Sequence, residues 1–414
     1  MAALDVEKLA REVERELWPL YREIEERMQE NQRRVLAAFR NQRVREYHFA
    51  GSTGYGYGDA GRAVLEAVYA EVFGAEGALV RPSIVSGTHA IFAVLKALLK
   101  PGQELLAITG APYDTLQKAI GIKGAETGTL REKGIGYRQV ELLPDGQIDL
   151  EGVTRALGPQ TGLVLIQRSR GYDLRPSLTV AQIKKAVAHI RSLRPDVPIF
   201  VDNCYGEFVE EMEPTHVGAD LIAGSLIKNP GGGLAPGGGY VAGKKKYLDL
   251  VAAELAAPGI GWEVGATYGL TRSYFQGLFL APHVVAQALQ GALFAAALFS
   301  RLGYEVYPGI HDVRGDIIQA VVLGSPEKML AFCRGLQSMS PVDSDVVPEA
   351  ALLPGYEDPV VMAGGTFIQG SSIELSADGP LRPPYAVYFQ GGLSRGYTVL
   401  ALTAAAREVG PRQE

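Results

Sequence analysis

Short apolar runs alternate with helix-like segments from about residue 78 to residue 257, and this alternation limits the fold more than any other feature of the chain. The apolar runs predict strands at Ala78–Val80, Glu104–Ile108, Tyr137–Val140, Gly162–Ile166, Ile199–Val201, Leu221–Ala223 and Gly239–Val241. The intervening segments predict helices at Arg62–Phe73, Thr88–Leu99, Tyr113–Ile120, Leu150–Ala156, Val180–Leu193 and Lys244–Ala257. This order is typical of an α/β fold, so we expect a mostly parallel seven-stranded sheet with helices on both faces. Ligands of such sheets bind at the carboxyl ends of the strands.

The segments on either side of this alternation have a different character. Residues 6–39 are charged and amphipathic and predict one or two surface helices, and residues 48–61 form a loop rich in Gly and Tyr. A long Ala-rich helix is expected at His283–Leu302. A tail follows, with strands expected at Ile317–Leu323, Ile373–Leu375 and Tyr385–Phe389 and loops at 340–365. We therefore predict an N-terminal arm (residues 1–60), a large domain (61–280) and a smaller C-terminal α+β domain (281–414).

Composition narrows the class of protein. The 414 residues are 47% hydrophobic, which suits a soluble protein of two or three domains. A net charge of -6 gives no electrostatic reason to expect nucleic acid or an anionic membrane as partner. No apolar stretch approaches the ~20 residues of a membrane span, and no signal peptide is evident at the start. The two cysteines suit a reducing cytoplasm, and no zinc-type spacing is present, so we predict a cytoplasmic protein without a metal.

An acid and a lysine in distinctive local sequences point to the chemistry. Asp202 follows the apolar run 198–201, and Lys228, 26 positions later, ends the apolar segment 223–228 before Asn-Pro and a glycine run. Proteins hold pyridoxal phosphate with a lysine bonded to its aldehyde and an acid that keeps the ring nitrogen protonated. A lysine in an apolar setting loses its charge readily, which that bond requires. We therefore predict pyridoxal phosphate as cofactor, with Lys228 as its attachment point and Asp202 at its ring nitrogen.

The same cofactor needs a site for its phosphate. Small and polar residues open the helix expected after residue 85, namely Ser86, Gly87, Thr88 and His89. The free backbone N–H groups and the dipole of a helix start favour an anion, and hydroxyl groups add hydrogen bonds. Ser225, three residues before Lys228, can bring its hydroxyl to the same phosphate. Taken alone, this segment also fits an ordinary capped helix start.

An aromatic side chain is expected to hold the cofactor ring flat. Tyr113 follows the predicted strand at 104–108 and is one candidate, and His89 is a rival for the same role. Either side chain alone also fits ordinary packing. The specific signal is the joint order of helix start, aromatic residue, acid and Ser-x-x-Lys.

This order resembles the fold-type I pyridoxal phosphate enzymes, and within them the cystathionine lyase and methionine gamma-lyase group. More narrowly, the chain resembles the bacterial proteins called aluminium resistance proteins, or methionine gamma-lyase family proteins. The motifs that carry the resemblance are Thr53–Tyr57, Ser86–Ala90, Val201–Phe208, Ser225–Gly233 and Gly259–Gly265. They span nearly the whole chain.

The resemblance implies a carbon–sulfur lyase that acts on a cystathionine-, methionine- or cysteine-like amino acid. It also implies a homodimer or homotetramer with the active site at a subunit interface. In that group a tyrosine of the N-terminal loop reaches the phosphate of the neighbouring subunit, and Tyr55 or Tyr57 matches it here. An arginine of the small domain binds the substrate carboxylate, and Arg382 is the nearest match.

The chain departs from the lyase pattern beside the reactive lysine. Ile227 stands where the lyases have a threonine, and Asn229 follows where they have an aromatic or aliphatic residue. One phosphate hydroxyl is therefore missing. Two alternatives to a lyase stay open: an aminotransferase or other chemistry at the α-carbon, and a non-catalytic cofactor-binding protein related to stress. No cluster of hard oxygen ligands for aluminium is evident.

Overall fold

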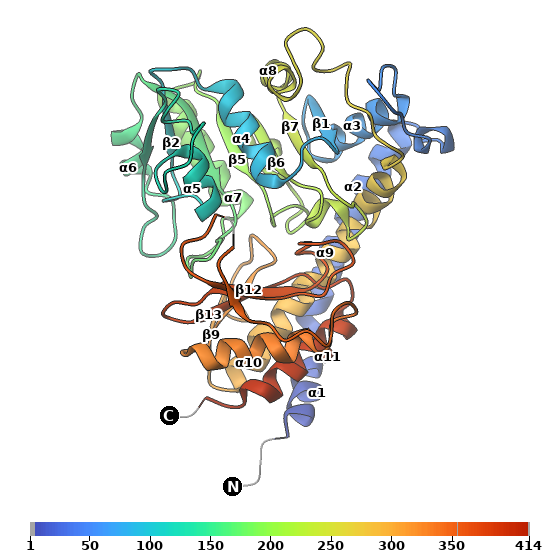
Figure 1. Cartoon of the computed structure of the whole chain (residues 1–414), viewed down its shortest axis with the longest axis vertical. Coiled ribbons are helices and arrows are strands. Elements are labelled where there is room, and N and C mark those ends of the chain that lie inside the picture. The colour runs from blue at the N-terminus through green and yellow to red at the C-terminus, as the bar shows by residue number, and fades with distance from the viewer. Residues whose placement is uncertain (1–4, 354, 413–414) are drawn as a thin grey trace.

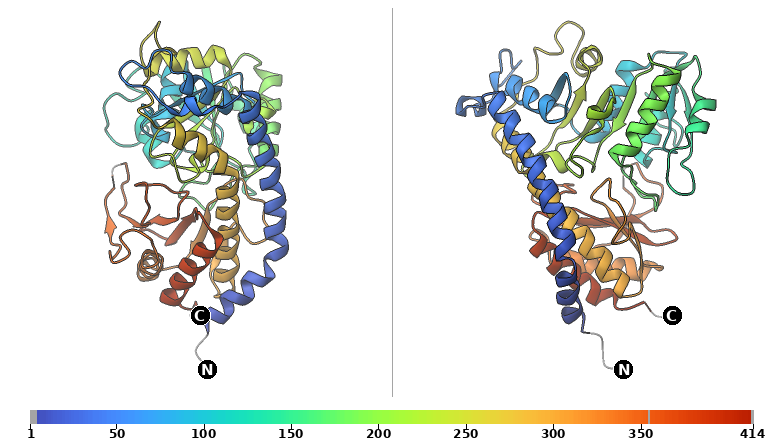
Figure 2. Two further views of the ribbon diagram at one scale, coloured as in Figure 1. Left: turned by 90° about the vertical axis from the view of Figure 1, so that its right-hand side faces the viewer. Right: turned by 180° about the vertical axis from the view of Figure 1, so that it is seen from behind.

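The computed structural model describes residues 5–353 and 355–412. A large α/β domain lies at one end of the molecule and a smaller sheet with its helices at the other (Figure 1). Long helices from the N-terminal arm and from the middle of the chain run along one side and join the two ends (Figure 2). This arrangement places the chain between residues 60 and 260 opposite the C-terminal sheet.

The sheet of the large domain has seven strands in the order β1-β7-β6-β5-β4-β2-β3. Their bounds are β1 Gly77–Arg81, β2 Glu104–Ala107, β3 Gly136–Gln139, β4 Thr161–Gln167, β5 Ile199–Asp202, β6 Leu221–Ser225 and β7 Gly239–Gly243. Only β7 runs against its neighbours, β1 and β6. The predicted mostly parallel seven-stranded sheet is confirmed, and each predicted strand occurs within a few residues of its expected place.

Helices cover both faces of this sheet because its strands are apolar on both sides. Leu163 and Leu165 of β4 belong to the core that includes residues of α4, α5 and α8. Val164 and Ile166 point to the opposite face, into the core that includes residues of α3, α6 and α7. The bounds are α3 Ala60–Val72, α4 Gly87–Leu98, α5 Asp114–Ile120, α6 Leu150–Ala156, α7 Val180–Leu193 and α8 Lys245–Leu255. These helices were predicted within a few residues at each end.

A second, antiparallel sheet forms the C-terminal part, in the order β10-β11-β12-β13-β9-β8. Its strands are β8 Glu305–Tyr307, β9 Gln319–Val322, β10 Ala350–Ala351, β11 Val360–Ala363, β12 Ser376–Pro380 and β13 Ala386–Gln390, and helices α10 Pro326–Gln337 and α11 Arg395–Val409 accompany them. Two expectations were wrong here. Ile373–Leu375 forms a turn immediately before β12, and the region 340–365 contains β10 and β11. Their pairing with distant partners, which a local pattern does not reveal, decides these strands.

The long helices are α1 Val6–Glu16, α2 Trp18–Asn41 and α9 Thr271–Arg301. Helix α9 begins twelve residues before its predicted start, so the predicted domain boundary at residue 280 falls inside it; the division into domains stays a prediction. Contrary to the sequence expectation, α9 is long and apolar enough to cross a membrane. However, 78% of its most apolar window is buried inside the protein, where it packs against α2 and α11. A core helix meets the same criterion, so α9 is weak evidence for a membrane span.

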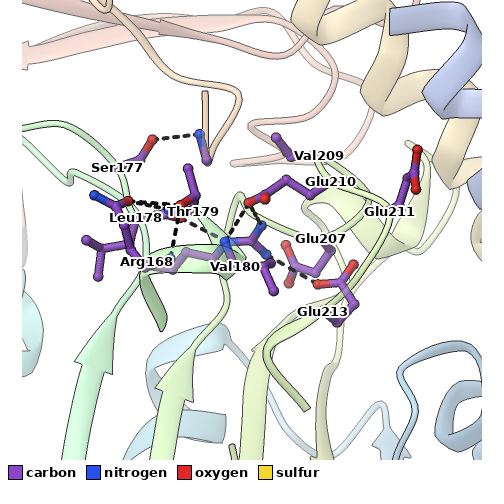
Figure 3. Close-up of polar contacts among 12 residues, drawn as sticks. Arg168, Ser177, Leu178, Thr179, Val180, Glu207, Val209, Glu210, Glu211 and Glu213 are labelled. Atoms are coloured by element: carbon purple, nitrogen blue, oxygen red, sulfur yellow. Dashed lines mark hydrogen bonds and ion pairs between the residues drawn. The ribbon is translucent and has the colours of Figure 1, made fainter. Parts of the chain in front are cut away.

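A buried guanidinium fixes the segment that follows Asp202. Arg168, fully buried directly after β4, donates to Asn203 Oδ1 at 2.8 Å. It also forms ion pairs with Glu213 at 3.3 Å and Glu210 at 3.0 Å, as Figure 3 shows for the two glutamates. From the other side, Asn31 of α2 donates to the carbonyl of Phe208 at 2.9 Å. These contacts hold residues 203–213 against the sheet and so set the position of the side chains that follow β5.

Replacement of this arginine tests its structural role. Arg168→Met leaves the buried Glu213 with only its longer ion pair to Arg34 at 3.7 Å, and we expect a loss of about 3–5 kcal/mol in the free energy of unfolding. Arg22→Met, which breaks a solvent-exposed pair with Glu26, is the matched control and should cost about 0.5 kcal/mol or less. Chemical denaturation measures both. Equal effects of the two substitutions would contradict the structural role of Arg168.

Candidate active site

A cavity of about 990 Å³ lies between the carboxyl ends of the large sheet and the face of the small sheet. The large domain contributes Thr88, Asp202 and Lys228 to its lining, and the small sheet contributes Asp378 and Tyr388. Residues from both halves of the chain therefore share one space.

Asp202 and Lys228 meet because β5 and β6 are parallel neighbours. Asp202 ends β5 beside Ala223 of β6, and Lys228 follows β6 by three residues. Asp202 is buried, and its Oδ1 accepts a hydrogen bond from the backbone N–H of Cys204 at 3.2 Å. Burial raises the pKa of this carboxyl, although the positive charge of Lys228 acts in the opposite direction.

The lysine itself lies against an aromatic ring. Lys228 Nζ is 3.9 Å from the centre of the Tyr205 ring, a cation–π contact. Burial acts to lower the pKa of Lys228, but Cys204, Tyr205 and Asp202 raise it more, so it lies well above its ordinary value. The structure therefore differs from the expectation that an apolar setting favours the neutral amine, because the effects of Cys204, Tyr205 and Asp202 on this pKa outweigh that of burial.

The start of α4 forms a tight polar corner of the cavity. Ser86 caps the helix and accepts from the backbone N–H of His89 at 3.1 Å. Gly87 lies so close to β6 that an added Cβ would be 3.3 Å from Ser225 Cβ and from Cys204 Sγ. The first N–H groups of a helix have no partner within it, so this corner presents donors to an anion. Its shape and donors fit the phosphate of pyridoxal phosphate.

The structure distinguishes the two candidates for the ring partner. Tyr113, at the start of α5, lines the cavity and donates from its hydroxyl to Thr88 Oγ1 at 3.0 Å. His89 Nδ1 instead accepts from the backbone N–H of Val85 at 3.2 Å, and His89 is absent from the described residues that line the cavity. The arrangement favours Tyr113 as the ring partner.

The remaining predicted residues lie at the edge of the site or outside it. Arg382 lines the cavity near solvent and pairs with Asp358 at 2.7 Å. Tyr55 and Tyr57 are 72% and 62% exposed and stack on each other, with ring centres 5.4 Å apart. They are not among the described residues that line the cavity of their own chain.

Sequence reasoning missed several side chains of the cavity. Tyr205 is one of them, although it belongs to the motif that begins at Asp202; its backbone has a φ of 69°, an uncommon value for a residue other than glycine. Arg175 also lines the cavity, and burial lowers its pKa to about 10. Asp378 is the third, and no local pattern marks it because only sheet pairing brings it to the site. Among residues 5–353 and 355–412 there is no group of three or more His, Cys, Asp or Glu side chains arranged to hold a metal.

The residues present fit pyridoxal phosphate as a group. A buried acid, a lysine, an aromatic hydroxyl and a helix start that packs closely on β6 face one cavity. Asn229, next to the lysine, is not among the described residues that line the cavity. Its side chain donates to the backbone carbonyl of Glu207 at 2.9 Å.

Comparisons with known proteins agree with this geometry. The family model described as "Methionine gamma-lyase" matches residues 6–410. The chain belongs to this family.

Two of the relatives are similar over nearly the whole length of both chains. The uncharacterized protein YnbB of Bacillus subtilis is 51% identical, over 97% of this chain and 95% of that protein. A crystal structure of a carbon–sulfur lyase involved in aluminium resistance from Clostridium novyi is 47% identical, with a TM-score of 0.93, over 97% of this chain and 94% of the other. Cystathionine gamma-synthase from Xanthomonas oryzae is 17% identical with a TM-score of 0.60, over 86% and 89% of the two chains, and shows the shared fold alone.

Membership of the methionine gamma-lyase family confirms three predictions from the sequence. They are the family resemblance, the fold-type I architecture with a second, smaller sheet domain, and the enzyme class of pyridoxal phosphate-dependent carbon–sulfur lyase. The roles of the individual site residues stay predictions.

The close approach of Gly87 to β6 gives a test of the phosphate site. Gly87→Ala places a methyl group 3.3 Å from Ser225 Cβ and Cys204 Sγ, so these neighbours or the start of α4 must move by a few tenths of an ångström. We expect about tenfold weaker binding of pyridoxal phosphate, measured by absorbance titration. Gly158→Ala, whose added methyl group would have its nearest neighbour 4.0 Å away, is the control. If Gly87→Ala bound pyridoxal phosphate with unchanged affinity, the assignment of the start of α4 to the phosphate site would be contradicted.

Proposed function

We propose that this chain cleaves a carbon–sulfur bond in a sulfur-containing amino acid of the cystathionine, methionine or cysteine type, by removal of the α proton and β- or γ-elimination. The observation that carries the proposal is the meeting of Asp202 and Lys228 in one cavity beside the start of α4. The names of relatives support it, since one with 47% identity is called a carbon–sulfur lyase.

The residues have separate roles in this proposal. Bound pyridoxal phosphate supplies a sink for the electron pair left when the α proton is removed. Asp202 keeps the ring nitrogen protonated, because a buried carboxylate strongly favours a cation beside it. Lys228 Nζ is the base that takes the α proton, and Tyr113 packs on the ring and orients it. Ser86, Gly87, Thr88 and Ser225 hold the phosphate.

The overall reaction balances without an oxidant or reductant. The proton leaves the α-carbon for Lys228, and the carbon–sulfur bond breaks with its electron pair going to sulfur. The thiolate takes up a proton and leaves as a thiol. The remaining unsaturated amino acid reacts with water and gives an oxo acid and ammonia.

Replacement of the lysine tests cofactor attachment and reaction together. Lys228→Ala is expected to lose the yellow absorbance of the bound cofactor and to form oxo acid about a thousandfold more slowly. Lys245→Ala, an exposed lysine on α8, is the control and should retain both properties. The readouts are the visible spectrum and oxo acid release from cystathionine, cysteine and methionine.

The same experiment separates the alternatives. Yellow enzyme that releases no oxo acid from any of the three substrates would contradict the lyase proposal. An aminated cofactor after incubation with amino acids would instead favour an aminotransferase. Bound cofactor without either reaction would favour the non-catalytic alternative.

We further propose that the enzyme works as a homodimer or homotetramer in which Tyr55 and Tyr57 reach the phosphate in the neighbouring subunit. Their high exposure supports this, because two large aromatic side chains that face solvent often mark a contact surface. The loop that carries them is held to its own chain through Tyr268 and Gly265, whose backbone N–H groups donate to Ser52 and Tyr55 at 2.9 and 3.0 Å. The loop therefore has a defined shape without a partner.

The double variant Tyr55→Ser, Tyr57→Ser tests this proposal. We expect a dimer or larger assembly for the wild type by light scattering, and about tenfold weaker cofactor binding for the variant. A wild-type monomer with full cofactor affinity would contradict the proposal.

A further inference from the structure

The face of the small sheet that meets the cavity carries a buried acid. Asp378 of β12 lies directly across from Tyr388 of β13, and Gln390, two residues further along β13, is on the same face. All three side chains line the cavity that contains Lys228. The acid therefore faces the space where a substrate of the proposed reaction would lie.

This acid is not fully paired. Asp378 is only 8% exposed, and its Oδ2 accepts from Gln390 Nε2 at 3.3 Å. Its Oδ1 is buried and has no hydrogen-bond partner of good geometry within the part of the chain that the structure describes, although the nearby Tyr172 hydroxyl lowers the pKa of the carboxyl against the larger effect of burial. An unpaired buried carboxylate oxygen is costly, and native proteins usually satisfy such atoms. A ligand with a positive group would supply the missing partner.

Aromatic rings surround the acid. Tyr172 lies with its ring centre 5.3 Å from that of Tyr388 and 5.6 Å from that of Tyr356, and all three line the cavity. Tyr205, whose ring contacts Lys228, packs on the same small cluster as Tyr172 and Tyr388. Aromatic faces attract cations, so the rings and the carboxylate together suit an ammonium group. Tyr205 contacts both Lys228 and the cluster of Tyr172 and Tyr388, so it links this cluster to the reactive lysine.

The arginines that line the cavity are already engaged. Each is held by another group: Arg170 by Asp316 and the carbonyl of Tyr307, Arg175 by backbone carbonyls, and Arg382 by Asp358. Lys228 is a further cation near Asp378, but attachment of the cofactor uses its amine. Asp378 is then the acid in this part of the cavity without a cation of its own.

We propose that Asp378, together with Tyr172 and Tyr388, binds a protonated amine at the far end of the substrate. The preferred substrate is then an amino acid whose sulfur substituent ends in an ammonium group. The inference rests on the proposed function, which places the substrate in this cavity. It adds that the thiol released from the substrate carries a positive charge.

A binding experiment tests the inference without requiring turnover. The holoenzyme is titrated with L-lysine and with L-2-aminoheptanoate, in which a methyl group replaces the terminal ammonium of lysine. Neither ligand contains sulfur, so neither can undergo the elimination. Burial raises the pKa of Asp378 to about 7, so pH 8 keeps the carboxylate ionised while the amine stays protonated. Calorimetry is expected to show at least tenfold tighter binding of lysine, and Asp378→Asn should abolish that preference. Asp173→Asn, an exposed carboxylate that also lines the cavity, is the matched control and should keep it.

Each outcome bears on the inference separately from the lyase proposal. Equal affinity for the two ligands, no measurable binding of lysine, or a preference that persists in Asp378→Asn would overturn it. Elimination is then compared for S-(2-aminoethyl)-L-cysteine and S-propyl-L-cysteine, with the ratio of kcat/KM expected to fall at least tenfold in Asp378→Asn. A binding preference without any elimination would support the inference and contradict the lyase proposal.

Discussion

The parallel pairing of β5 and β6 is the constraint on which the rest of the site depends. It brings the end of one strand, Asp202, beside Ala223 of the next, and so places the acid within reach of the lysine that follows β6. The reversed strand β7 closes the other side of β6 and pairs with β1, from which the chain leads to α4. The acid, the lysine and the anion site of the helix start therefore meet at one sheet edge, as open α/β sheets place their ligands.

The segment after β5 has an unusual conformation that other parts of the chain stabilise. Tyr205 and Phe208 have φ values of 69° and 63°, which cost free energy in residues other than glycine. The ion pairs of Arg168 and the side chain of Asn31 hold this segment in place. The result is that the ring of Tyr205 lies against Lys228, and the long helix α2 is linked to the active site through packing and hydrogen bonds.

Two sets of residues with different proposed roles line the cavity. In the proposed function the edge of the large sheet provides the groups for the cofactor, and this part of the proposal agrees with membership of the methionine gamma-lyase family. The small sheet provides Asp378 and Tyr388, and Tyr172, which follows β4 of the large domain, packs against Tyr388. In our proposals the first set carries out the reaction and the second selects the substrate by charge.

The sequence by itself determined the sheet of the large domain and the helices around it, and it predicted the elements that we propose hold the cofactor. These features depend on local patterns: apolar strands, capped helix starts, and the residues around Asp202 and Lys228. Only the tertiary structure favours Tyr113 over His89 as the proposed ring partner, because Tyr113 lines the cavity while His89 accepts a hydrogen bond from the backbone of Val85. It also decided the strands β10 to β12 and the place of Asp378, since cross-strand pairing between distant residues leaves no signal at a fixed spacing. Only the tertiary structure decided the charge environment of Lys228 as well, because residues that are distant in the sequence and close in space set its pKa.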